Sequence, residues 1–149
     1  MISTVRGQYV LLFLGLLMLG NSACVPPDPF HTLTGTWHLI QYENGHTGEV
    51  QHEPDDLPRA VIVSFDDQGK RGSFTAETPT NQLRGTYQIE NDGDMETTEV
   101  EGTLFGEPEW SEGLWEALQT AKRYRITGQM MEIYYEDGLQ RMIFERLGN

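Results

Sequence analysis

Two histidines in one acidic loop are the first side chains in this sequence that suggest a chemical site. His46 and His52 lie within residues 43–60, together with Glu49 and Glu53. Imidazole and carboxylate groups bind metal ions, but zinc sites need two to four ligands at a tight spacing that this loop lacks. The loop is therefore either a loose metal-binding patch or a solvated acidic connection, and we expect the second.

Motifs for catalysis are the next feature that the sequence can be searched for. It contains no Gly-x-Ser-x-Gly turn, no His-Glu-x-x-His pair and no phosphate-binding glycine loop. Carboxylate pairs are frequent, but a chain of 149 residues with 23 Asp and Glu contains such pairs by chance. We therefore expect a protein that is not an enzyme and that needs no cofactor and no metal ion.

A group of basic residues lies near the C-terminus. Arg123 and Arg125 alternate with apolar residues, so both would lie on the polar face of one strand, and Arg141 follows on a neighbouring strand. These residues form either a small anion-recognising face or the counter-charge of the acidic remainder. We favour the counter-charge, because opposite charges on neighbouring strands stabilise a sheet.

The overall charge restricts the partners. The chain has 10 Lys and Arg against 23 Asp and Glu, which gives a net charge of −13. Nucleic-acid phosphates need a basic surface, so we expect no nucleic-acid partner. The length and a hydrophobic fraction of 38% are typical of one globular domain.

The only cysteine, Cys24, follows an apolar segment near the N-terminus. Residues 9–20 carry no charge, and as a helix they would span about 18 Å, well short of the hydrocarbon core of about 30 Å. Such a segment is typical of a signal peptide. It resembles the signal of bacterial lipoproteins, in which a peptidase cuts before a cysteine that then carries lipid. The alternative is an ordinary secretory signal with a chance cysteine.

The lipoprotein resemblance implies a division of the chain into three parts. Residues 1–23 would be the signal peptide, residues 24–32 a lipidated Cys24 with a proline-rich tether, and residues 33–149 the domain. The prolines of the tether favour an extended spacer. Enteric lipoproteins with Asp directly after the cysteine stay in the inner membrane, and this chain has Val25. We therefore expect a palmitate-bearing protein of the cell envelope, anchored in the outer membrane by its lipid.

Strand patterns dominate the expected domain. Short segments rich in aromatic and β-branched residues alternate with turn residues such as Asn-Gly and Asp-Gly. Residues 43–60 interrupt this pattern as a long polar connection. The expected strands are residues 35–42, 61–65, 72–75, 85–90, 95–103, 124–126, 131–135 and 140–145.

One helix is expected from about Ser111 to Lys122. Its apolar residues recur with helical spacing, and Ser111 can cap its first turn. Trp110 and Trp115 would then occupy the two positions that form a hydrophobic staple. The apolar positions are Leu114, Ala117, Leu118 and Ala121.

Three segments in order carry a resemblance to a known family. The first contains Gly35 and Trp37 in a Gly-x-Trp-x-Leu pattern, and the second contains Asn81, Gly85 and Tyr87 in the pattern Asn-x-x-x-Gly-x-Tyr. The third closes the chain in Phe-x-Arg. Together they resemble the META domain of small bacterial envelope proteins, which includes a heat-inducible lipoprotein group.

The META resemblance implies a fold, a cross-link and a function. Family members carry two cysteines where this chain has Thr80 and, near the second, Gly106, so these two regions should lie close together. The expected fold is a single α+β domain, a twisted antiparallel sheet or partial barrel with one helix. The family motif residues would be structural, and the function would be a non-enzymatic one linked to envelope stress or drug tolerance through an envelope protein or small ligand.

A lipocalin-like carrier of a small apolar ligand is the alternative. Lipocalins also begin with Gly-x-Trp, so Gly35 and Trp37 alone cannot separate the two families. A lipocalin barrel needs eight antiparallel strands around a cavity. The motif from Asn81 to Tyr87 favours the META domain.

Overall fold

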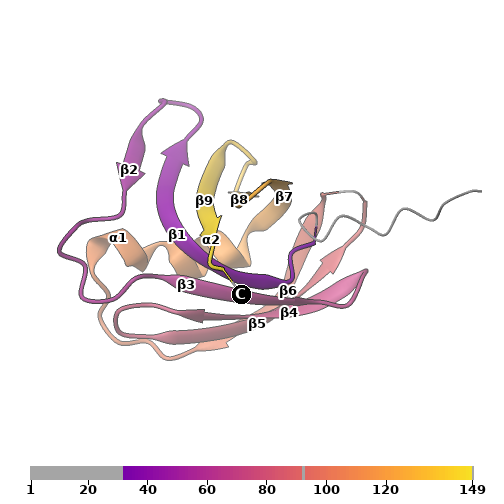
Figure 1. The fold of residues 1–149 in the computed structure, drawn as a ribbon, viewed down its shortest axis with the longest axis horizontal. Coiled ribbons are helices and arrows are strands. Elements are labelled where there is room, and N and C mark those ends of the chain that lie inside the picture. The colour runs from indigo at the N-terminus through magenta and orange to yellow at the C-terminus, as the bar shows by residue number, and fades with distance from the viewer. Residues whose placement is uncertain (1–31, 92, 149) are drawn as a thin grey trace, which may run out of the picture.

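The computed structural model describes residues 32–91 and 93–148, which form an antiparallel sheet with two short helices (Figure 1). The signal peptide, Cys24 and the tether up to residue 31 lie outside the described residues. Within the described ranges, no helix has the length and apolarity to cross a membrane. The strands are β1 (Gly35–Asn44), β2 (Val50–His52), β3 (Ile62–Asp67), β4 (Arg71–Glu77), β5 (Gln82–Ile89), β6 (Met95–Gly102), β7 (Ala121–Thr127), β8 (Met130–Tyr135) and β9 (Gln140–Arg146).

The sheet curls into a nearly closed barrel. The strand order is β6-β5-β4-β3-β1-β9-β8-β7, so the first and last strands of the domain lie side by side at its centre. The two edges approach each other at a corner where Asp94 bridges to Arg123 and the Tyr124 N–H donates to the Gly93 carbonyl oxygen at 2.7 Å. Beyond that corner, β6 contacts helix α2 (Leu114–Gln119) through a hydrogen bond of 2.7 Å from Thr97 to Leu118.

Strand β1 bends and pairs with two different strands along one of its edges. Its first half pairs with β3, its second half pairs with β2, and a bulge between Leu39 and Gln41 interrupts its pairing with β9. Strand β2 corrects the expectation that residues 43–60 form only a polar connection. It has three exposed residues and no apolar alternation, so its pairing depends on backbone bonds to β1 that the sequence pattern does not reveal.

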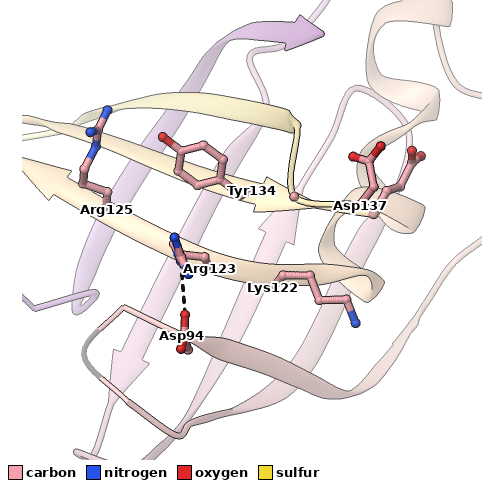
Figure 2. A pocket seen from close by; sticks show the side chains of 8 residues that line it. Asp94, Lys122, Arg123, Arg125, Tyr134 and Asp137 are labelled. Carbon is pink, nitrogen blue, oxygen red and sulfur yellow. Dashed lines mark hydrogen bonds and ion pairs between the residues drawn. The ribbon is translucent and has the colours of Figure 1, made fainter. Parts of the chain in front are cut away.

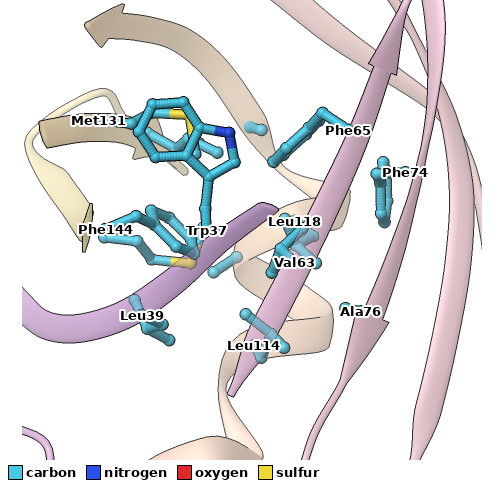
Figure 3. Packing of buried hydrophobic residues seen from close by; sticks show 14 of the residues in the cluster. Trp37, Leu39, Val63, Phe65, Phe74, Ala76, Leu114, Leu118, Met131 and Phe144 are labelled. Atoms are coloured by element: carbon cyan, nitrogen blue, oxygen red, sulfur yellow. The ribbon is translucent and has the colours of Figure 1, made fainter. Parts of the chain in front are cut away.

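The core fills the space between the two halves of the sheet (Figure 3). Strand β5 shows how alternation builds it, because Leu83, Gly85 and Tyr87 are buried and the residues between them are exposed. Trp37 and Phe144, from the paired strands β1 and β9, are fully buried near its centre. These strands confirm the expected antiparallel, barrel-like sheet.

The single helix expected from Ser111 to Lys122 is wrong in extent and in its first turn. The structure has α1 (Glu109–Glu112) and α2, separated at Gly113, and the chain enters β7 at Ala121. Pro108 rather than Ser111 precedes the first turn, so Trp110 lies inside α1 and the predicted staple does not form. The apolar face of α2 was predicted correctly, since Leu114, Ala117 and Leu118 are buried, and Ala121 is buried as the first residue of β7.

Candidate functional site

The Gly-x-Trp and Phe-x-Arg segments meet because β1 pairs with β9. The Trp37 indole N–H donates to the Leu33 carbonyl oxygen at 2.9 Å, and the Arg146 guanidinium lies 4.0 Å from the centroid of the Trp37 ring. Arg146 also donates to the backbone carbonyls of Thr34 and Thr32 at 2.9 and 3.2 Å. Gly35 makes room for this contact, because a Cβ atom there would lie 2.7 Å from the Arg146 Nη1. These residues secure the entry of the chain into the barrel.

Gly85 and Tyr87 also contribute to packing in the core. A Cβ atom on Gly85 would lie 2.4 Å from the Phe74 ring, so only glycine leaves room for that ring on the neighbouring strand. Tyr87 is 1% exposed, and its ring packs edge-on against Phe65 at a centroid distance of 5.8 Å. Both residues therefore contribute to the core.

Asn81 holds a loop that is distant in sequence. Its side-chain oxygen accepts from the Phe105 N–H at 2.7 Å, and its Nδ2 donates to the Phe105 carbonyl oxygen at 2.8 Å. The neighbouring Thr80 hydroxyl donates to the Gly106 carbonyl oxygen at 2.9 Å. This contact confirms the expectation that the Thr80 and Gly106 regions lie close together. The segment of residues 103–108, which we call the Asn81 loop, is therefore fixed at both of its central residues.

Glu107 joins this loop network, and the sequence did not suggest it. Its carboxylate accepts from Asn81 at 2.6 Å, from Ser111 at 2.8 Å and from Thr78. Burial by itself would raise the pKa of Glu107, but these hydrogen bonds and a contribution from Thr80 together lower it below its usual range. The carboxylate is thus ionised and fully engaged within the fold. No spacing signal could have found it, because it lies 26 positions from Asn81.

Two apolar side chains project from the fixed Asn81 loop. Leu104 is 82% exposed and Phe105 is 69% exposed. Beside them is a hollow of about 320 Å³ whose lining includes Leu83 and the half-buried Trp115. Asn81 and Thr80 hold the backbone of this loop, so the loop has little backbone entropy to lose when its exposed apolar side chains contact a partner.

A hollow of about 650 Å³ is lined by Arg123 and Arg125, two of the three basic residues predicted near the C-terminus (Figure 2). Arg123 donates to Asp94 at 3.1 Å, and Arg125 pairs with Glu132 at 2.6 Å. Each of these arginines thus has an acidic partner, which favours the counter-charge interpretation. Arg141, on β9, pairs with Glu43 and Glu132 at 2.7 and 3.1 Å.

The two histidines of the acidic loop, His46 and His52, do not come together in a common site. His46 Nε2 lies 2.6 Å from Asp137 Oδ2, and this hydrogen bond is the main reason that the pKa of Asp137 lies below its usual range. His52 is exposed on β2. In the part of the chain that the structure describes, no group of three His, Cys, Asp or Glu side chains could hold a metal ion.

Comparison with known proteins identifies a family and related folds. The model of the META domain family matches residues 31–147. The NMR structure of a protein from Burkholderia xenovorans is similar with a TM-score of 0.63 at 18% identity, over 87% of this chain and 97% of that one. The crystal structure of a DUF4847 family protein from Bacteroides vulgatus has a TM-score of 0.57 at 16% identity, over 78% of this chain and 95% of that one. No curated protein matches the sequence significantly. At these identities the two structures show a shared fold alone.

Proposed function

The chain belongs to the META domain family, and on this premise we propose that it is a lipid-anchored, non-enzymatic module of the bacterial cell envelope. The observation that carries the anchor is the position of Cys24, the only cysteine, which three small or polar residues separate from the uncharged apolar segment 9–20. Acyl chains on this cysteine would bind the membrane firmly, since each buried methylene contributes about 0.8 kcal/mol.

The use of the family motif residues supports a binding module rather than an enzyme. Asn81 makes its hydrogen bonds to the backbone of Phe105 and to Glu107, and Trp37 donates to the backbone of Leu33. These polar groups are therefore engaged in holding the fold. The exposed Leu104 and Phe105 of the Asn81 loop are the surface that we propose for contact with an envelope partner.

The packed interior favours the module over a lipocalin-like carrier. A carrier needs a cavity of at least about 300 Å³ for its ligand. Here the centre of the barrel is occupied by large side chains that are fully buried, among them Trp37, Met131 and Phe144 (Figure 3). A role in envelope stress or drug tolerance is part of the proposal and follows from the family resemblance.

Replacement of Cys24 tests the anchor. We expect Cys24→Ser to abolish labelling by palmitate and to leave the protein either soluble or with an uncut signal. Val25→Asp is the matched variant, because it keeps the lipid and should move the protein from the outer to the inner membrane. A Cys24→Ser protein that is processed and fractionates with membranes as the parent does would refute the proposal.

A further inference from the structure

We propose that a hollow at the α1 end of the sheet binds a protonated primary amine that carries a hydrogen-bond acceptor close to it. This hollow, which we call the acidic hollow, has a volume of about 200 Å³. That space suits an aminoalkyl chain, since drug-sized ligands occupy pockets of about 300–1,000 Å³. The residues that carry the inference are Tyr42, Glu49, Glu109, Trp110 and Tyr135.

Aromatic rings form one wall of the acidic hollow. Tyr42 on β1 and Trp110 on α1 meet edge to face with their centroids 5.4 Å apart, and Tyr135 at the end of β8 completes the wall. Rings of this kind attract a cation to their faces. Burial, the neighbouring Tyr135 and Glu107 raise the pKa of Tyr42 far above its usual range, so its hydroxyl stays neutral and can accept a bond from an ammonium group.

Two buried polar atoms in this wall lack a partner. The Tyr42 hydroxyl and the Trp110 Nε1 are both buried, and neither makes a hydrogen bond within the part of the chain that the structure describes. Trp110 is only 9% exposed, so the missing bond to its N–H is costly unless a ligand or water supplies an acceptor. An ammonium group alone cannot satisfy that donor. A ligand that satisfies both atoms therefore carries a carbonyl or hydroxyl oxygen near its amine.

The carboxylates at the rim give the acidic hollow its charge. Glu43, Glu49 and Glu109 line it, and no Lys or Arg is among its described lining residues. Glu43 is neutralised by Arg141 at 2.7 Å, whereas Glu49 and Glu109 have no basic partner within residues 32–91 and 93–148. Two unpaired carboxylates beside aromatic rings attract a cation and repel an anion.

Titration of the full chain in neutral detergent micelles tests the proposal. The probe is a blocked Gly-Lys-Gly peptide, which offers an ammonium and carbonyl oxygens, and binding is followed by the NMR signal of the Trp110 indole N–H. The same peptide with norleucine in place of lysine is the neutral control. We expect saturable binding of the lysine peptide, a shift of the Trp110 signal, and at least tenfold weaker binding of the norleucine peptide.

Variants locate the site. We expect the pair Glu49→Gln and Glu109→Gln to weaken binding of the lysine peptide about tenfold or more, and Tyr42→Phe to weaken it while keeping the ring. Glu99→Gln on β6 is the matched control, because Glu99 is exposed and lies outside the acidic hollow. Equal binding of the norleucine peptide, an unmoved Trp110 signal, or unchanged binding by the glutamine pair would each overturn the proposal.

A second probe identifies the source of the amine. Ethanolamine combines an ammonium and a hydroxyl without a peptide. Tighter binding of the lysine peptide than of ethanolamine supports a basic side chain of a partner protein, and the reverse order supports a small amino alcohol. Both outcomes support the same site chemistry, and neither depends on whether Cys24 carries lipid.

Discussion

The hydroxyl of Thr80 donates to the carbonyl oxygen of Gly106 at 2.9 Å, although the two residues lie 26 positions apart. The contact joins the turn before β5 to the Asn81 loop. The family resemblance implies that related domains carry cysteines at the position of Thr80 and near that of Gly106. In this chain a hydrogen bond and the Asn81 contacts hold the two segments together instead of a covalent bridge.

A disulfide should be tolerated at this contact. We expect Thr80→Cys combined with Gly106→Cys to form a bridge under oxidising conditions, in a background where Cys24 is replaced by Ala. A Cβ atom on Gly106 would meet no atom within 4 Å. If the bridge is unstrained, closing this loop should add roughly 3–4 kcal/mol to the free energy of unfolding. Thiol titration and urea unfolding check this, and two free thiols after oxidation would contradict a geometry suited to a bridge at these positions.

Trp37→Ala should be severely destabilising. The side chain is fully buried, donates to Leu33 and supports the Arg146 guanidinium. Truncating such a residue costs about 3–5 kcal/mol, a large part of a typical domain stability of 5–15 kcal/mol. Trp115→Ala is the control, because Trp115 is only partly buried. Thermal unfolding should show a large drop in Tm for the first variant and a small one for the second. If Trp37→Ala kept full stability and instead lost binding of a partner or ligand, Trp37 would be a recognition residue.

Alanine substitutions at two glycines should change the stability of the protein in opposite directions. Gly35 has a φ of 139°, and an added Cβ would meet Arg146, so Gly35→Ala should cost roughly 1–3 kcal/mol. Gly113 has a helical φ of −75° and open space around it, so Gly113→Ala should add about 0.4–1 kcal/mol. Urea unfolding of both variants measures the difference. A loss of stability in Gly113→Ala would contradict the structure at the junction of α1 and α2.

Acid should weaken the Asn81 loop through Glu107. The pKa of this carboxyl is lower in the folded protein than its ordinary value of 4.5, so the stability that it contributes is present above that pH. It is lost as the pH falls through the folded-state pKa. We expect Glu107→Gln to reduce the slope of unfolding free energy against pH in this acidic range. Glu112→Gln, at an exposed residue of α1, should keep the slope of the parent, and an unchanged slope in Glu107→Gln would refute this role.

Local patterns determined the strands and the buried face of the helical region. Alternation in residues 85–90 and the glycine-containing turns depend on neighbours in sequence, and the structure confirms a strand there in β5, which begins three residues earlier, and a hairpin of β8 and β9. The helical spacing of Leu114, Ala117 and Leu118 is equally local, and these residues are buried. Local patterns did not determine where the helix begins. The Ser111 hydroxyl donates to Glu107 instead of capping the first turn.

Only the tertiary structure decided where the polar groups meet. The contacts of Asn81 with Phe105 and Glu107, and the pairing of Val50–His52 with β1, join residues with no periodic relation in sequence. The acidic hollow likewise draws its wall from β1, α1 and the end of β8. Such contacts follow from the curvature of the sheet. This curvature depends on bulges and on the packing of Trp37 and Phe144, which lie on paired strands. The physical reason is that sequence patterns record which side of an element faces the core, whereas the partners across the core are set by the closure of the whole sheet.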